Sequence, residues 1–285
     1  MNSSFFGFFA HAGFLDGLQR LGLRPTEIAG ASAGALTGGF YAAGYPTDEI
    51  LGMVRDPEIA SLFREGAPGF GRMLGTFLNR DGQTGALSGK RALKMLRRYF
   101  GDRRIEDLRD PGFSLSVANL SRSVSQVIHE GPLAEYILAS CAVPGMFRAQ
   151  KIGDEFYWDG GVADPIPFEQ WLVSNPNNPG GAKNHRNAKP AKKIRRVIVH
   201  LVVNAEDLAE RRNPHPSFYK GLGRCHQIIS DEIFRLKLEL ARSQGQEITI
   251  LRTVAPRPGP GKLELGDRCI ELGRKTALSY FADAK

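Results

Sequence analysis

The stretch G-A-S-A-G-A-L, Gly30 to Leu36, constrains this chain more than any other. The short run from Glu27 that precedes Ser32 predicts a strand. The Ala- and Gly-rich residues from Ala33 to Ala43 predict a tightly packed helix. A serine between a strand and a helix is typical of a nucleophile elbow, a sharp turn that exposes the serine hydroxyl. Ser32 is therefore a candidate nucleophile, and the alternative is a small residue that only caps the helix.

Strand patterns and helix patterns alternate along the rest of the chain. Helices are expected at Phe14–Leu21, Thr47–Phe63, Gly89–Phe100, Pro132–Ala139, Ser230–Arg242 and Asp267–Phe281. Strands are expected at Phe113–Leu120, Ser125–His129, Arg196–Val203 and Glu247–Val254, and a strand followed by a turn at Glu155–Gly161. The second strand would form a hairpin with the first, and the apolar run from Arg196 is typical of a buried parallel strand. This alternation predicts a layered α/β fold.

A second polar turn follows the strand that begins at Glu155. It reads D-G-G, and Gly160 and Gly161 would let the backbone bring Asp159 close to a neighbouring segment. A third motif, A-S-C-A-V-P-G from Ala139, lies between the two turns. Taken alone, Asp159 fits an Asx turn that stabilises its own loop as well as it fits a general base.

The three motifs together resemble the patatin-like phospholipase family, over about residues 5 to 170. The resemblance implies a single domain over residues 1–285, a three-layer α/β/α sandwich with a mainly parallel central sheet. It also implies a lipid acyl hydrolase that cleaves fatty-acyl esters of phospholipids through a Ser–Asp dyad and an acyl-enzyme intermediate. By position, Ser32 is the nucleophile and Asp159 the general base. Gly30 and Gly34 belong to the elbow, and no cofactor or metal is implied.

The glycine-rich oxyanion loop of the family is only partly matched. The chain reads N-S-S-F-F-G from Asn2, so Gly7 matches, and Ser3 and Ser4 are the other candidate donors. The family's first strand is missing ahead of this loop, and losing one oxyanion donor costs about 3 kcal/mol. Two hypotheses follow. The chain is a copy of an active enzyme whose true start lies upstream, or it is a non-catalytic relative that binds lipid or serves as a scaffold.

The proposed base raises a chemical question, because an ordinary Asp has a pKa of about 3.9 and is a poor base. Burial must raise the pKa of Asp159, or the proton must pass on to the leaving group in concert. Tyr157 and Trp158 are candidates for an apolar wall beside it. The alternative chemistry is a Ser–Asp–His triad, for which His200 or His226 follows Asp159 in the required order.

Charge and cysteine usage predict the setting. The net charge is +8, and Lys and Arg gather on the helix from Gly89 and in segment 174–195, which is predicted to be a disordered basic insertion. The helix predicts peripheral docking on anionic phospholipid surfaces. The insertion has no interleaved aromatic residues, which argues against nucleic-acid binding. Three cysteines without C-x-x-C spacing and no long apolar run predict a cytoplasmic protein with peripheral membrane association.

Overall fold

The computed structural model describes residues 1–56, 58, 84–172, 194, 196–210, 214–259, 262 and 264–282. The predicted insertion at 174–195 lies almost entirely outside these residues, as does most of the second half of the helix expected from Thr47.

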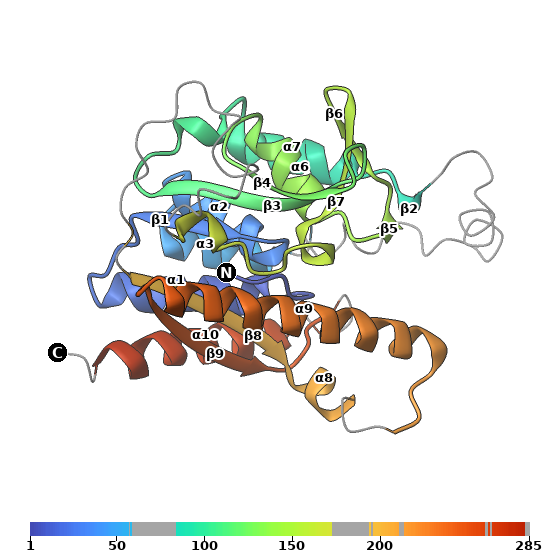
Figure 1. Ribbon diagram of the computed structural model, residues 1–285. Coiled ribbons are helices and arrows are strands. Elements are labelled where there is room, and N and C mark those ends of the chain that lie inside the picture. Colours follow the sequence, from blue (N-terminus) through green and yellow to red (C-terminus); the bar gives the residue numbers. More distant parts are fainter. Residues whose placement is uncertain are drawn as a thin grey trace.

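Strands and helices alternate along the described residues, as expected of an α/β protein (Figure 1). The strands are β1 (Glu27–Gly30), β2 (Gly85–Leu87), β3 (Gly112–Asn119), β4 (Val124–Ile128), β5 (Gly145–Phe147), β6 (Gln150–Ile152), β7 (Glu155–Asp159), β8 (Arg196–Asn204) and β9 (Glu247–Ala255). The α-helices are α1 (Phe8–Arg20), α2 (Ala33–Ala42), α3 (Thr47–Arg55), α6 (Lys90–Phe100), α7 (Leu133–Ser140), α8 (Ala205–Glu210), α9 (Phe218–Ser243) and α10 (Leu265–Ala282). Short 3-10 turns occupy Ile105–Asp107, Gly160–Val162 and Glu169–Trp171.

The sheet around β3 is mixed, which corrects the expectation of a mainly parallel sheet. β3 pairs with β1 in parallel, but it pairs with β4 and with β7 in antiparallel fashion, and β6 pairs antiparallel with β7. The hairpin expected between β3 and β4 is confirmed. β8 and β9 form a separate parallel pair. All eight residues of β3 are buried, which places this strand at the centre of the fold.

The first residues of the chain lie between β1, in the sheet around β3, and β8, in the β8–β9 pair. From the sequence, the family's first strand was expected to be missing ahead of these residues. The Met1 amine donates to the Ala29 carbonyl at 2.8 Å, and the Ala31 N–H donates to the Met1 carbonyl at 3.2 Å. On the other side, the Asn2 N–H donates to the His200 carbonyl at 3.3 Å. Residues 1 and 2 thus connect β1 to β8, and the N-terminus lies in the middle of the molecule (Figure 1).

Helices cover both faces of the β8–β9 pair. Val197, Val199 and Leu201 pack against Phe234, Leu238 and Ala241 of α9. The alternate residue His200 points the other way and contacts His11 and Phe14 of α1, since successive side chains of a strand point to opposite faces. In Figure 1, α9 crosses in front of these strands. A larger apolar core lies around β1 and β3, against α2, α6 and α7.

Most predicted helices are present, with shifted ends. α2, α7 and α10 agree with their predictions within two residues. α1 begins at Phe8, six residues earlier than expected, and α9 begins at Phe218, twelve residues earlier. On α6, Leu96 and Phe100 are buried and belong to the apolar core around β1 and β3.

Candidate functional site

Ser32 lies on a strained turn between β1 and α2. Its backbone angles are φ 50° and ψ −114°, a conformation that residues other than glycine rarely adopt. Close packing keeps the turn tight. A Cβ on Gly30 would lie 2.4 Å from the Gly34 carbonyl, and one on Gly34 would lie 2.4 Å from the Met1 carbonyl. Gly30 and Gly34 therefore have no room for a side chain, which keeps the backbone between β1 and α2 tightly turned at Ser32.

Asp159 ends β7, and its carboxyl group is buried beside this turn. One oxygen, Oδ1, accepts a hydrogen bond from the Gly161 N–H at 2.6 Å, whereas the buried Oδ2 has no hydrogen-bond partner. Burial raises the pKa of Asp159 to about 7; hydrogen bonding to the Ser32 side chain and to the Gly161 N–H limits this rise. The Ser32 side chain is therefore close enough to influence this pKa, but it makes no hydrogen bond to the buried Oδ2.

The glycines after Asp159 allow close backbone approach. A Cβ on Gly160 would lie 2.2 Å from the Ser116 carbonyl, and one on Gly161 would lie 2.2 Å from the Ser3 hydroxyl. The D-G-G turn therefore fits between β3 and the N-terminal residues. Neither position has room for a side chain.

The aromatic neighbours of Asp159 lie on different sides of β7. Tyr157 is buried, and its hydroxyl donates to the Glu155 carboxylate at 2.6 Å. Trp158 is half-buried, and its Nε1–H donates to the Phe147 carbonyl at 3.2 Å. Side chains alternate along a strand, so only Tyr157 shares the buried side of Asp159.

The candidate oxyanion loop lies near Asp159 and Gly161, but the amides of Ser3 and Gly7 are already engaged. The Ser3 N–H donates to the Pro165 carbonyl at 2.9 Å, and the Gly7 N–H donates to the Ser4 carbonyl at 2.8 Å. The Ser4 hydroxyl accepts from the Asn204 side chain at 3.4 Å. Donation from Ser3 or Gly7 to an oxyanion would require these bonds to exchange. Their oxyanion role stays a prediction.

The two histidines considered for a triad make hydrogen bonds elsewhere. His200 lies 2.9 Å from His11 through their Nδ1 atoms and 2.8 Å from the Thr253 hydroxyl through Nε2. It is a satisfied core residue. His226, on α9, lies 3.0 Å from the Val162 carbonyl. Neither set of contacts orients His200 or His226 toward Ser32.

Sequence reasoning assigned no role to three residues that support this site. Ser140 and Cys141 bond the backbone of Ser32, and Ser116 bonds Ser140. Ser140 and Cys141 belong to the A-S-C-A-V-P-G motif, whose presence was noted without a function.

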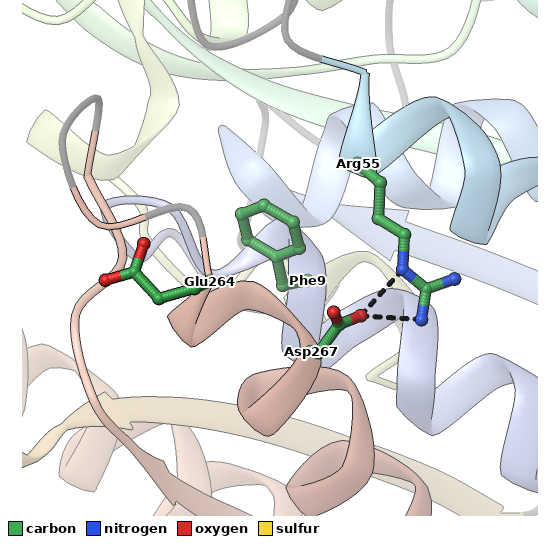
Figure 2. A pocket seen from close by; sticks show the side chains of 4 residues that line it. All are labelled: Phe9, Arg55, Glu264 and Asp267. Atoms are coloured by element: carbon green, nitrogen blue, oxygen red, sulfur yellow. Dashed lines mark hydrogen bonds and ion pairs between the residues drawn. The ribbon is translucent and has the colours of Figure 1, made fainter.

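A cavity of about 240 Å³ lies away from these residues, lined by Phe9, Arg55, Glu264 and Asp267 (Figure 2). Arg55 of α3 and Asp267 of α10 form an ion pair of 2.7 Å beside it. Charged groups that pair with one another make this cavity a poor candidate for a fatty chain.

Within the described ranges, no three His, Cys, Asp or Glu side chains are arranged to hold a metal ion. None of the described helices offers the length and continuous apolar surface that a bilayer crossing requires.

The fold and the site together define a class: an α/β protein with a serine on a strained strand–helix turn beside a buried carboxyl group. The family model for patatin-like phospholipases matches residues 5–172, and the chain belongs to that family. It is similar to an uncharacterized NTE family protein of Mycobacterium bovis, with 29% identity over 160 residues, which cover 56% of this chain and 41% of that protein. It is also 29% identical over 160 residues to the lysophospholipase NTE1 of Candida glabrata, covering 55% of this chain and 9% of that protein.

The chain thus spans less than half of the length of these two relatives. Among solved structures, it is similar to the crystal structure of VipD from Legionella pneumophila, with a TM-score of 0.50 and 13% identity. That match covers 99% of this chain and 66% of VipD. At this identity the likeness concerns the fold alone.

Proposed function

We propose that this protein is a lipid acyl hydrolase that cleaves fatty-acyl esters of phospholipids or lysophospholipids through a Ser32–Asp159 dyad. The observation that carries the proposal is the buried Asp159 carboxyl, whose Oδ2 has no hydrogen-bond partner, close to Ser32 on a strained turn. Family membership supports the substrate class, and the name of the Candida glabrata relative favours lysophospholipids.

The chemistry follows from these positions. The Ser32 oxygen attacks the ester carbonyl while its proton passes to the carboxylate of Asp159, whose Oδ2 has no other partner. The tetrahedral intermediate then expels the alcohol, which takes the proton, and leaves an acyl group on Ser32. Water activated by Asp159 releases the fatty acid and restores the serine. α2 begins directly after Ser32, so the partial positive charge of its N-terminus favours the developing oxyanion.

A base with a pKa of about 7 is well suited to this task at neutral pH. An ordinary aspartate would be almost fully ionised but too weak to take the serine proton. Burial therefore answers the chemical objection to a carboxylate base without a histidine.

Hydrolysis of a short-chain p-nitrophenyl ester and of a lysophospholipid tests the proposal directly. We expect Ser32→Ala and Asp159→Asn to lose at least 100-fold in kcat, because each removes one member of the dyad. Ser88→Ala, which changes an exposed serine outside the dyad, is the matched control and should keep the wild-type rate.

The second candidate function is a non-catalytic lipid-binding or scaffold protein. The observation that favours it is the engagement of the Ser3 and Gly7 amides, which leaves the oxyanion loop without these donors. Equal hydrolysis by wild type and Ser32→Ala would support this second function and remove the first.

Peripheral association with anionic phospholipid surfaces is part of the proposal. α6 exposes Lys90, Arg91 and Lys94 on the side away from its buried face. Arg97 and Arg98 are also exposed but are paired with Glu135 and Glu58. We therefore expect the exposed Lys90 and Lys94 side chains to contribute to the attraction of α6 to anionic headgroups.

A further inference from the structure

Two buried hydroxyl groups connect the turn at Ser32 with the turn that follows Asp159. The Ser32 N–H donates to the Ser140 hydroxyl oxygen at 2.9 Å, and the Ser140 hydroxyl donates to the Ser116 carbonyl at 2.8 Å. The Ser116 hydroxyl in turn donates to the Asp164 carbonyl at 2.8 Å. Ser116 and Ser140 are both fully buried.

The Ser32 amide needs such a partner. Its positive φ is of the kind that costs about 1 to 3 kcal/mol and persists only where surrounding contacts hold it. The amide also precedes the first residue of α2, where no intrahelical acceptor is available to it. An amide left unsatisfied in the protein interior costs about 1 to 3 kcal/mol. Because a hydroxyl can accept one hydrogen bond and donate another, Ser140 satisfies this amide and is itself anchored to β3.

The two residues after Ser140 extend the same support. The Cys141 thiol donates to the Ser32 carbonyl at 3.3 Å, and burial raises the pKa of this thiol, which keeps it a donor. The Ala142 carbonyl accepts from the Asp159 N–H at 3.0 Å. Three consecutive residues therefore hold the backbone of both the nucleophile and the base.

We propose that Ser140 is a positioning residue of the nucleophile. Through its bond to the Ser32 amide, it keeps the elbow in the conformation that points the serine oxygen at Asp159. Ser140 acts on Ser32 alone and does not touch the ester. This inference rests on the proposed hydrolase function and assigns a role to the A-S-C-A-V-P-G motif.

The test compares Ser140→Ala with Ser114→Ala. Ser114 is also buried on β3, and its hydroxyl accepts from the Gln170 side chain at 2.8 Å, so its removal likewise deletes one buried hydroxyl contact. We expect Ser140→Ala to lower kcat about 30- to 100-fold with KM within about twofold of wild type, since a displaced nucleophile affects the chemical step rather than binding. Ser114→Ala should retain kcat. Ser140→Thr, which keeps the hydroxyl, should recover at least part of the loss.

Amide hydrogen exchange supplies a readout that does not depend on activity. In Ser140→Ala the peptide containing Ser32 should exchange at least tenfold faster than in wild type, while Ser114→Ala leaves it unchanged. If Ser140→Ala unfolds, Ser140→Cys serves in its place, because a thiol keeps most of the volume but accepts hydrogen bonds weakly.

Unchanged kcat and unchanged exchange in Ser140→Ala would overturn the role of Ser140. Equal losses in the Ser140→Ala and Ser114→Ala variants would also overturn it, because any buried serine would then have the same effect. A wild-type protein no faster than Ser32→Ala is a different result. It would remove the proposed hydrolase function, whereas the exchange rates would still decide whether Ser140 holds the Ser32 amide.

Discussion

The Asp159 carboxyl group accepts a hydrogen bond from the Gly161 N–H through one oxygen only, at 2.6 Å. Its second oxygen, Oδ2, is buried without a hydrogen-bond partner. A carboxylate that accepts several N–H bonds becomes a weaker base. With a single such bond and no access to water, Asp159 keeps its affinity for a proton near neutral pH.

The first prediction concerns the pH dependence of hydrolysis. The base must be unprotonated to accept the Ser32 proton, and the pKa of Asp159 is about 7. We expect kcat/KM to fall about tenfold per pH unit below pH 7 and to level off above it. A pH-stat measurement of released fatty acid follows the rate without depending on the ionisation of a dye. A profile that stays flat down to pH 4 would contradict a base of raised pKa.

The second prediction concerns the stability cost of the same carboxyl group. The pKa of Asp159 is raised from 3.8 to about 7, so the folded state binds this proton more tightly than the unfolded state. Its contribution is fully present below pH 3.8 and is lost as pH rises through 7. We expect Asp159→Asn to be more stable than wild type at pH 8, by up to about 4 kcal/mol, with a much smaller difference at pH 4. Denaturant unfolding at both pH values measures this.

The control for this variant is Asp154→Asn. Asp154 is exposed between β6 and β7, so the same chemical change there removes no buried charge. Its unfolding free energy should follow that of wild type at both pH values. A gain at pH 8 in both variants would indicate an effect of net charge rather than of burial.

The third prediction concerns the ion pair between Lys237 of α9 and Asp164, which lies five residues after Asp159. The two groups are 2.6 Å apart, and their side chains are only 13% and 4% exposed. Lys237→Met would leave the Asp164 carboxylate buried without this cation. We therefore expect a loss of about 3 kcal/mol in the free energy of unfolding. Arg235→Met on the same helix is the matched control, because its ion pairs with Glu232 and Glu239 are exposed and contribute little.

Equal destabilisation by Lys237→Met and Arg235→Met would show that the loss comes from changing α9 and not from breaking the ion pair between Lys237 and Asp164. A selective loss in Lys237→Met would instead show that α9 holds the turn after Asp159 in place. In that case kcat should fall together with stability.

The sequence predicted the parts of the site that depend on local geometry. A serine followed by a tightly packed helix, and an aspartate followed by two glycines, can each be recognised in the sequence, because small residues mark tight turns and close backbone approach. The relative direction of neighbouring strands could not be predicted, because the apolar sequence of β3 is the same whether it pairs with parallel β1 or with antiparallel β7. Ser140 was also missed, because no local pattern shows that its hydroxyl faces a residue 108 positions away.

Helix ends were misjudged for a related reason. The first part of α9 contains Gly221 and Gly223 and exposes Leu222, so its pattern lacked the buried stripe that predicts a helix. The first turns of α1 are almost uniformly apolar and buried, so they too show no helical period. The first turns of α1 are helical through their contacts with α3 and α10 rather than through a pattern in the sequence.

The fourth prediction concerns stability in mild acid. Burial lowers the pKa of His11 to about 3 and that of His200 well below its usual value. The His11 and His200 rings contact each other. His200 also contacts Phe14 and the Thr253 hydroxyl, and His11 contacts the Asn2 carbonyl. The Met1 amine lowers both pKa values further. Below pH 6.5 the unfolded state binds more protons than the folded state, so stability falls as pH falls. We expect a loss of about 2 kcal/mol per histidine between pH 6.5 and 5.

This measurement is best made on the Asp159→Asn variant, because Asp159 changes stability in the opposite direction between pH 3.8 and 7. Replacing both residues, His11→Gln with His200→Gln, should make the slope shallower, since amides do not titrate. The buried Met1 amine, whose pKa is lowered to about 5, contributes the slope that is left. His226→Gln, which changes an exposed histidine, should leave the slope intact. An equally steep slope without His11 and His200 would assign it to other groups.

The fifth prediction concerns binding to lipid surfaces through α6. Lys90 and Lys94 are exposed there, and each basic residue near an anionic surface contributes about 1 kcal/mol. The double variant Lys90→Gln with Lys94→Gln should therefore bind vesicles containing phosphatidylglycerol about 30-fold more weakly than wild type, as measured by co-sedimentation at low salt. Lys275→Gln, on α10 at the other end of the molecule in Figure 1, is the control and should bind normally. Binding that does not respond to phosphatidylglycerol content would rule out electrostatic docking. An equal loss in Lys275→Gln would assign the attraction to net charge rather than to α6.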